Sequence, residues 1–191
     1  CLRLQKWIHE GRAISPVSVN FSRYTVLEET FCQRLAELSD HYQIERNLLE
    51  IEITENALDV REEDLRRIID TVRRFGFSVS IDDFGVEFSN LSLFSGADFD
   101  ILKLDRSLIQ DIAVNEKARA LIQAMSDVCL KMNIKLVAEG VETEEQLNIL
   151  NQCHVNIAQG FLFSKPIPVA DYETKYLPLP DADLNGGQDK C

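Results

Sequence analysis

Short apolar runs alternate with amphipathic helical patterns along most of this 191-residue sequence. The apolar runs have the length and composition of buried β-strands, and we expect six of them, at residues 16–21, 48–54, 77–81, 99–104, 134–138 and 155–158. Helical spacing predicts helices at residues 2–11, 22–40, 62–75, 107–112 and 116–132, one capped by Thr143 and Gln146, and a last one from about Val169. Strand followed by helix, six times, favours a parallel α/β fold.

Each expected strand ends in a polar side chain. These residues are Asn20, Glu52, Asp82 with Asp83, Lys103, Glu139 and Gln159. For any one of them, the start of a solvated loop is at least as good an explanation as a functional role. Six in succession, all of types that bind metals or handle protons, favour one shared site at one edge of the sheet.

The spacing of strands decides which parallel fold can bring these side chains together. In an open sheet, six strands about 4.8 Å apart spread their ends over roughly 24 Å, too far to share an ion. In a barrel the same ends form a ring around one mouth, where TIM-barrel active sites lie. We therefore expect a TIM-like α/β barrel. A complete barrel has eight strands and about 250 residues, so we expect two further strands upstream of Cys1.

Carboxylates gathered at such a mouth need a cation. Two carboxylates roughly 4 Å apart repel by about 4 kcal/mol at an effective dielectric constant near 20. The three histidines and five cysteines are scattered and share no ligand spacing, so the expected ion is one held by oxygen. Mg²⁺ or Mn²⁺, one or two per site, fits these donors better than Zn²⁺.

The charge of the chain limits its partners. A formal net charge of −12 argues against binding a nucleic-acid polymer, which depends on clustered Lys and Arg, but allows a small phosphate ligand reached through metal ions. No apolar run approaches the roughly 20 residues of a membrane span. Unpaired cysteines are typical of the reducing cytoplasm, where we expect this domain whether or not its parent protein is membrane-anchored.

Six motifs that carry these residues resemble the EAL domain, a bacterial phosphodiesterase family that hydrolyses cyclic di-GMP to linear pGpG. The motifs are, in order, SVNFS, EIEITEN, SIDDFG, LKLDRS, VAEGVET and AQGFLFSKPIP. The resemblance runs from the start of the chain to about Pro168. It implies a modified TIM barrel, of the (β/α)8 type, whose first strand is antiparallel to the others.

The resemblance also implies roles for individual residues. The metal ligands would be Asn20, Glu52, Asp82 and Glu139, with Asp83 serving a second metal. Lys103 would orient or help to deprotonate the attacking water, and Gln159 would contact that water or a metal. Glu55 would anchor the loop that follows Asp82 and Asp83, and Glu139 belongs to the catalytic set as well as to the ligands.

Two departures from the family pattern bear on activity. The Glu-Ala-Leu motif, whose Glu is a metal ligand in the family, is not in this sequence and is expected upstream of Cys1. The family loop DDFGTGYSSL reads DDFGVEFSNL here, with Val86 for a threonine and Glu87 for a glycine. Glycine adopts backbone angles that Glu resists, and a further carboxylate near phosphates repels them. The alternative to an active enzyme is therefore a weak or inactive domain that serves as a cyclic di-GMP receptor or a protein-interaction module.

We expect the barrel domain to occupy residues 1–176, incomplete at its N-terminal end, and residues 177–191 to form a mobile tail without apolar periodicity. The family implies two partners besides cyclic di-GMP: a second copy, bound through helices near the Asp82-Asp83 loop, and sensory or GGDEF-type domains upstream. The tripeptide Asp83-Phe84-Gly85 does not indicate a kinase, because the sequence has no glycine-rich loop, V-A-I-K lysine or H-R-D loop.

Overall fold

The computed structural model describes residues 1–54, 62–85, 94 and 96–180. Within them, six strands form one sheet in which every neighbouring pair is parallel and the spatial order follows the chain. The strands are β1 (Val17–Asn20), β2 (Leu49–Thr54), β3 (Ser78–Phe84), β4 (Ile101–Leu104), β5 (Lys135–Ala138) and β6 (Ile157–Ala158). The parallel α/β arrangement expected from the alternating sequence is confirmed.

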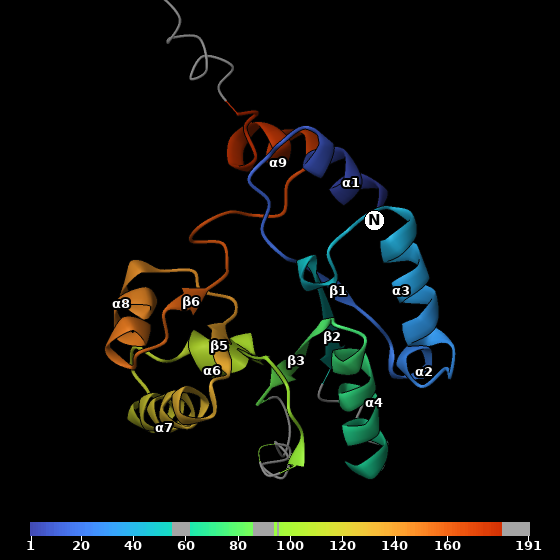
Figure 1. Cartoon of the computed structure of the whole chain (residues 1–191). Coiled ribbons are helices and arrows are strands. Elements are labelled where there is room, and N and C mark those ends of the chain that lie inside the picture. The colour runs from blue at the N-terminus through green and yellow to red at the C-terminus, as the bar shows by residue number, and fades with distance from the viewer. Residues whose placement is uncertain (55–61, 86–93, 95, 181–191) are drawn as a thin grey trace, which may run out of the picture.

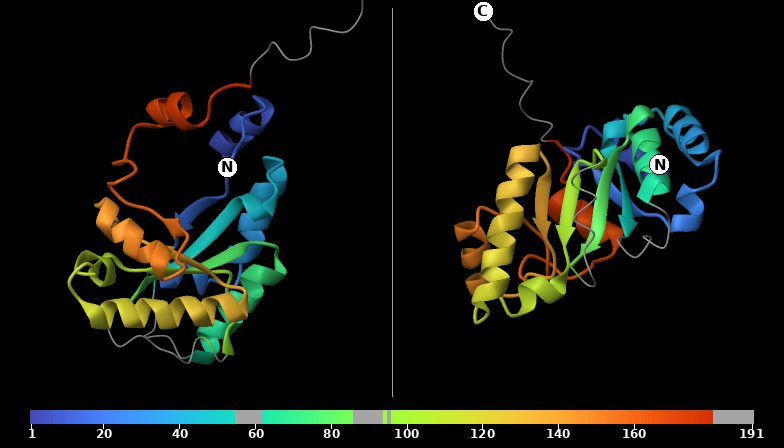
Figure 2. Two further views of the ribbon diagram at one scale, coloured as in Figure 1. Left: turned by 90° about the vertical axis from the view of Figure 1, so that its left-hand side faces the viewer. Right: turned by 90° about the horizontal axis from the view of Figure 1, so that it is seen from below.

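Helices connect the strands and cover one side of the sheet. They are α1 (Leu2–His9), α2 (Arg23–Val26), α3 (Phe31–His41), the 3₁₀ helix η1 (Arg46–Leu48), α4 (Glu62–Arg74), α6 (Arg106–Gln110), α7 (Glu116–Met132), α8 (Glu144–Gln152) and α9 (Val169–Tyr176). The sheet curls, and α3, α4, α7 and α8 lie around its outer side, while α1 and α9 lie together beyond one end (Figures 1 and 2). Among the described strands, β1 and β6 are the two edges.

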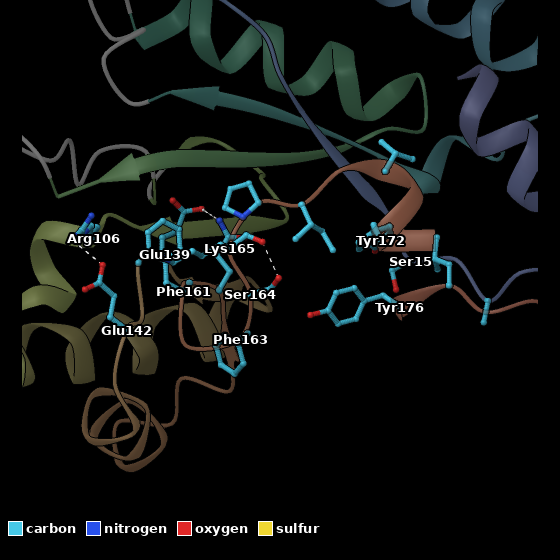
Figure 3. A pocket seen from close by; sticks show the side chains of 18 of the residues that line it. Ser15, Arg106, Glu139, Glu142, Phe161, Phe163, Ser164, Lys165, Tyr172 and Tyr176 are labelled. Atoms are coloured by element: carbon cyan, nitrogen blue, oxygen red, sulfur yellow. Dashed lines mark hydrogen bonds and ion pairs between the residues drawn. The ribbon is translucent and has the colours of Figure 1, made fainter. Parts of the chain in front are cut away.

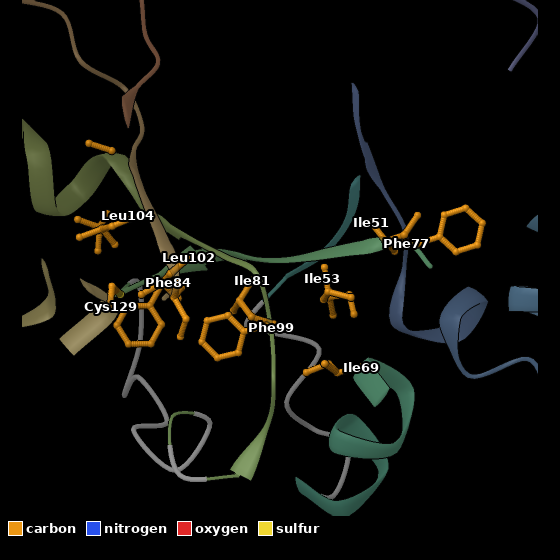
Figure 4. Packing of buried hydrophobic residues seen from close by; sticks show 14 of the residues in the cluster. Ile51, Ile53, Ile69, Phe77, Ile81, Phe84, Phe99, Leu102, Leu104 and Cys129 are labelled. Atoms are coloured by element: carbon orange, nitrogen blue, oxygen red, sulfur yellow. The ribbon is translucent and has the colours of Figure 1, made fainter. Parts of the chain in front are cut away.

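The two faces of the central strands differ in chemistry because successive side chains point to opposite sides. Apolar residues occupy the face under the helices and are almost fully buried (Figure 4): Ile51, Ile53, Val79, Ile81, Leu102 and Leu104. The alternate positions are polar and lie on the inner face of the curl: Glu52, Ser80, Asp82 and Lys103. The outer face is therefore the hydrophobic core, and the inner face carries the candidate site residues.

The structure divides the helix expected over residues 22–40 into two. Helix α2 ends at Val26, and a turn follows in which the N–H of Phe31 donates to the carbonyl of Glu28 at 3.0 Å. Val26 and Phe31 are both buried, yet five residues apart on one continuous helix they would point about 140° away from each other. The turn lets both reach the core. Leu27, part of the expected apolar stripe, is instead 43% exposed.

The bounds of several strands also differ from those expected. Strand β3 continues to Phe84 rather than ending at Ile81, so Asp82 and Asp83 belong to the strand itself. The register of its pairing with β4 shifts between Ile81 and Phe84. Asp82 and Asp83 lie within this irregular stretch. Strands β4 and β6 are shorter than the apolar runs that predicted them.

Side-chain caps fix where two helices begin. The hydroxyl of Thr143 accepts from the N–H of Gln146 at 3.2 Å, and the side chain of Gln146 accepts from the N–H of Thr143 at 3.1 Å. The expected capping box of α8 is therefore confirmed. Asp105 caps α6 by accepting from the N–H of Ser107 at 2.8 Å, so this carboxylate serves the helix rather than the site.

The four cysteines in the described ranges are free thiols. Cys32, Cys129 and Cys153 are buried free thiols, as expected, and Cys1 is exposed. Burial raises the pKa of the Cys129 thiol to about 11. Cys191 lies outside the described residues. No helix in the described ranges has the length and apolar character needed to span a bilayer.

Polar contacts hold α9 against α1. The indole N–H of Trp7 donates to a carboxylate oxygen of Glu173 at 2.7 Å, and Arg3 lies 3.1 Å from the same oxygen. Arg12 donates to the backbone carbonyl of Glu173 at 3.2 Å and also to that of Leu177, whose side chain is buried. These contacts join the first and last helices of the described chain.

The core can be tested at Ile69, a fully buried residue of α4 in the same cluster as Ile53 and Ile81 (Figure 4). The substitution Ile69→Ala should lower the free energy of unfolding by about 2–5 kcal/mol, because it leaves a cavity. The control Leu130→Ala removes the same number of carbon atoms as Ile69→Ala, but from a side chain that is 78% exposed. It should change the free energy of unfolding by less than about 0.5 kcal/mol. Urea unfolding of the full-length protein measures both, and equal effects would contradict the burial.

Candidate active site

Lys103 lies at the centre of a group of carboxylates on the inner face of the sheet. Its Nζ atom is 2.6 Å from a carboxylate oxygen of Glu139, 2.7 Å from one of Glu52 and 3.4 Å from one of Asp82. The lysine side chain is only 8% exposed. The Nε2 atom of Gln159 donates to Glu139 at 2.8 Å. Five of the predicted site residues are thus joined in one network.

Neighbouring strands supply this network. Glu52 comes from β2, Asp82 from β3 and Lys103 from β4, and Glu139 directly follows β5. In a flat sheet, β2 and β5 would lie about 14 Å apart, yet Glu52 and Glu139 contact the same nitrogen atom. The curvature of the sheet is therefore what brings these side chains together, as the choice of a barrel over an open sheet predicted.

The network contains more carboxylates than cations, and this perturbs its ionisation. Burial acts to lower the pKa of the Lys103 ammonium, but its hydrogen bonds to Glu139 and Glu52 outweigh burial and raise that pKa above its ordinary value. Burial raises the pKa of Glu139, although Lys103 acts in the opposite direction. Lys103 therefore stays protonated, and Glu139 holds a proton more readily than an exposed glutamate.

Asp83 lies next to the network in a strained part of the backbone. Its φ angle is +57°, in the left-handed region, and its N–H donates to Oδ1 of Asp82 at 3.0 Å. Burial raises the pKa of the Asp83 carboxyl, and the negative charges of Asp82 and Asp105 raise it further. A non-glycine residue at such an angle is uncommon outside turns and functional sites.

Asn20 is brought to the same edge but not into the network. It is the last residue of β1 and pairs in register with Glu52 on β2. Its side chain is exposed, and within the described residues it makes no hydrogen bond to the carboxylates. Glu55, Val86 and Glu87 lie outside the described residues, so their expected roles stay predictions.

The chemistry of the donors suits a hard divalent cation. Glu52, Asp82, Asp83 and Glu139 offer carboxylate oxygens, and Asn20 adds an amide oxygen, the ligands that Mg²⁺ and Mn²⁺ prefer. In the described ranges these carboxylates do not surround an empty point as a ready-made metal cluster; they surround the ammonium of Lys103. Because one ammonium cannot balance four carboxylates, the residues fit the added positive charge of a metal ion.

A cavity of about 880 Å³ opens beside the network (Figure 3). One end is lined by Glu139 and Gln159, and the other by residues of α1 and α9, including Trp7 and Tyr172. Four residues at the network end were not among the predicted site residues: Arg106, Glu142, Phe161 and Lys165. Their signal in the sequence was membership of the quoted motifs: Arg106 stands in LKLDRS, Glu142 in VAEGVET, and the other two in AQGFLFSKPIP. Arg106 and Glu142 form an ion pair at 2.9 Å.

Comparison with known proteins identifies the family. The model of the EAL domain matches residues 1–166. This chain belongs to the EAL domain family. Cyclic di-GMP phosphodiesterase NbdA of Pseudomonas aeruginosa is 41% identical over 125 residues, which are 65% of this chain and 16% of NbdA. The matched residues thus make up less than a fifth of that relative's length. Helix α9 follows the residues that the family model matches.

Solved EAL structures share the fold of this EAL domain. The EAL domain of Mycobacterium smegmatis DcpA superposes with a TM-score of 0.84 and 31% identity, over 91% of this chain and 78% of that one. Klebsiella pneumoniae BlrP1, solved as complexes of cyclic di-GMP with calcium or manganese, gives a TM-score of 0.75 and 28% identity, over 79% of this chain and 39% of that one. The expected TIM-like α/β fold, here as six strands of a curled half-barrel, is confirmed.

The role of Lys103 in balancing charge can be tested by Lys103→Met. Without the ammonium, the buried carboxylates of Glu52 and Asp82 and the partly buried one of Glu139 face one another, and we expect a loss of stability of about 3–5 kcal/mol. Crowded carboxylates bind protons more tightly in the folded than in the unfolded state, so the loss should be greater at pH 8 than at pH 5. Added Mg²⁺ or Mn²⁺ should restore part of the melting temperature.

The matched control is Lys135→Met, which removes an exposed lysine from the opposite end of β5. It should leave the melting temperature and its dependence on pH and on divalent ions unchanged. Thermal unfolding of the full-length proteins at both pH values measures these effects. If Lys103→Met were as stable as wild type at pH 8 without metal, the proposed charge balance would be wrong.

Proposed function

We propose that this EAL domain hydrolyses cyclic di-GMP to linear pGpG and depends on one or two divalent ions, Mg²⁺ or Mn²⁺. The observation that carries the proposal is the convergence of Glu52, Asp82 and Glu139 on Lys103 at the edge of a cavity. NbdA is named a cyclic di-GMP phosphodiesterase, and BlrP1 was solved with cyclic di-GMP and manganese or calcium. Those statements concern the relatives, and they support the same ligand and cofactor class here.

In this proposal the inner-face residues divide between metal binding and proton handling. Asn20, Glu52, Asp82 and Glu139 would hold one ion, and Asp83 a second. When bound, such ions supply positive charge to the phosphate and increase the acidity of water. Lys103 and Gln159 would act without holding a metal, and Glu139 would belong to both groups.

Hydrolysis adds the oxygen of water to phosphorus and breaks the bond from phosphorus to the 3′ oxygen of ribose, which takes up a proton. Lys103 stays protonated, because its carboxylate partners raise its pKa, and it therefore acts as a hydrogen-bond donor that orients the water. A carboxylate must accept the proton that the water loses. Glu139 suits this step, because burial raises its pKa and Gln159 fixes its position with a hydrogen bond. Glu55 would anchor the loop after Asp83.

The second candidate function is a receptor or interaction module that binds cyclic di-GMP without turning it over. The sequence of the loop favours it, since Val86 and Glu87 replace a threonine and a glycine of the family pattern. Both functions use the same cavity and differ only in the rate of the chemical step. Binding alone therefore cannot separate them.

The surroundings of the domain are part of the same proposal. We place the domain at residues 1–176 with a tail at 177–191, in the cytoplasm of a bacterial cell. Sensory or GGDEF-type domains would lie upstream, and a second copy would bind through helices near the Asp82-Asp83 loop.

Product analysis of the full-length protein tests the proposed function. With cyclic di-GMP and Mn²⁺ or Mg²⁺ we expect linear pGpG, separated by liquid chromatography, and EDTA should abolish its formation. Readdition of Mn²⁺ or Mg²⁺ should restore the rate. Tight binding of cyclic di-GMP without product would instead support the receptor.

Substitutions in the loop then test whether Val86 and Glu87 limit turnover. The double variant Val86→Thr with Glu87→Gly restores the two family residues. A large gain in rate would show that the loop limits catalysis, whereas an unchanged rate would show that this EAL domain tolerates it. Equilibrium binding of cyclic di-GMP by both proteins controls for a change in affinity.

A further inference from the structure

Gln146 is a buried amide whose four hydrogen bonds reach two different segments of the chain. The residue is only 8% exposed. Its Oε1 atom accepts from the N–H of Glu142 at 2.8 Å and from that of Thr143 at 3.1 Å. Its Nε2 atom donates to the carbonyls of Ile109 and Gln110, both at 3.3 Å. An amide has two donors and two acceptor positions, so these bonds use its full capacity.

The two segments are those that leave β4 and β5. The Nε2 atom contacts the end of α6, the helix that starts three residues after Lys103. The Oε1 atom holds the N–H of Glu142, three residues after Glu139. A capping box needs only the reciprocal bonds between Thr143 and Gln146. The bonds to α6 are therefore additional to those that start α8.

A second set of contacts joins the same two segments at the other end of α6. Gly140 has a φ angle of +69°, and a Cβ atom there would overlap the side chain of Arg106. The carboxylate of Glu142 pairs with Arg106 at 2.9 Å (Figure 3). Val141 is fully buried, and its N–H donates to the carbonyl of Gln159 at 3.1 Å. Residues 140–143 are thus held by α6 on one side and by the segment after β6 on the other.

These contacts bear on Glu139, which stands between β5 and residues 140–143. The pairing of β5 with β4 ends at Ala138, and the N–H of Glu139 donates to the carbonyl of Leu104 at 3.1 Å. The carboxylate of Glu139 lies 2.6 Å from Lys103 and accepts from Gln159 at 2.8 Å. A misplacement of reacting groups by about 1 Å can slow a reaction about a hundredfold. The segment that follows Glu139 must therefore be held in place for the network to keep its geometry.

We propose that Gln146 is a positioning residue, which fixes Glu139 relative to Lys103 by tying residues 140–143 to the end of α6. The inference rests on the proposed function, because it gives Glu139 a part in metal binding and in the chemical step. Gln146 is not among the described residues that line the cavity, so it acts through other residues and not on the ligand. It affects the rate and the affinity for the metal ion rather than the affinity for the nucleotide.

The alternative role for Gln146 is half of the capping box of α8, and four variants separate the two roles. Gln146→Glu keeps both acceptor positions for the cap but cannot donate to the carbonyls of α6. Gln146→Met removes all four bonds without adding a charge. Thr143→Ala removes the other half of the capping box and leaves the amide bonds to α6 in place. Gln152→Glu makes the same chemical change as Gln146→Glu at an exposed residue of the same helix.

The experiment measures kcat, KM and melting temperature of the full-length proteins, the Kd for Mn²⁺ without nucleotide, and the Kd for cyclic di-GMP in EDTA. Both Gln146 variants should lower kcat by about tenfold to a hundredfold and raise the Kd for Mn²⁺ by about tenfold. Their KM and their Kd for cyclic di-GMP should stay within about twofold of wild type. Thr143→Ala should lower the melting temperature by a few degrees, as expected for a lost cap, with kcat unchanged. Gln152→Glu should match wild type throughout.

Three results would overturn the positioning role: wild-type kcat and Mn²⁺ affinity in Gln146→Met, an equal loss of kcat in Thr143→Ala, or a loss of nucleotide affinity as large as the loss of kcat. If Gln146→Glu does not fold, Gln146→Met decides the question. A wild-type protein that binds cyclic di-GMP but forms no product would refute the proposed hydrolysis and leave the Mn²⁺ comparison to decide the role of Gln146. A wild-type protein that neither forms product nor binds Mn²⁺ would refute both.

Discussion

The buried ammonium of Lys103 is the group on which the arrangement of the mouth depends. A buried charge costs several kcal/mol unless partners compensate it, and here the partners come from strands before and after its own. They can do so only while the sheet stays curved, because flat strands would hold Glu52 and Glu139 too far apart. The apolar outer face, with Ile53 and Leu102 packed under the helices, therefore stabilises the polar inner face indirectly.

The same dependence explains why much of the site could be predicted from the sequence. In a parallel sheet all carboxyl ends lie at one edge, and closure into a barrel gathers them around one mouth, so polar residues at the strand ends predict proximity once a barrel is chosen over an open sheet. Glu52, Asp82, Lys103, Glu139 and Gln159 follow this rule and are joined in the structure. The strand pattern, with its short apolar runs between helices, likewise predicted the parallel fold.

What could not be predicted is the partner that each polar side chain takes. Asp105 lies two residues after Lys103 and has the chemistry of the site, yet it caps α6, because a free helix N-terminus competes for it. Asn20 reaches the right edge but points its side chain to solvent. Periodicity also failed at α2 and α3, since a turn can bring Val26 and Phe31 to one core without a continuous helix.

Phe161 and Lys165 escaped prediction for a further reason, which bears on how the cavity works. Strand ends are arranged by the sheet, but residues beyond them are placed by local backbone contacts, and here by the close packing of Gly160 on Val141. A site built this way has two structural origins. The sheet fixes the groups proposed for chemistry, and the segment after β6 lines part of the cavity beside them. The two remain coupled, because Gln159 at the start of that segment donates to Glu139.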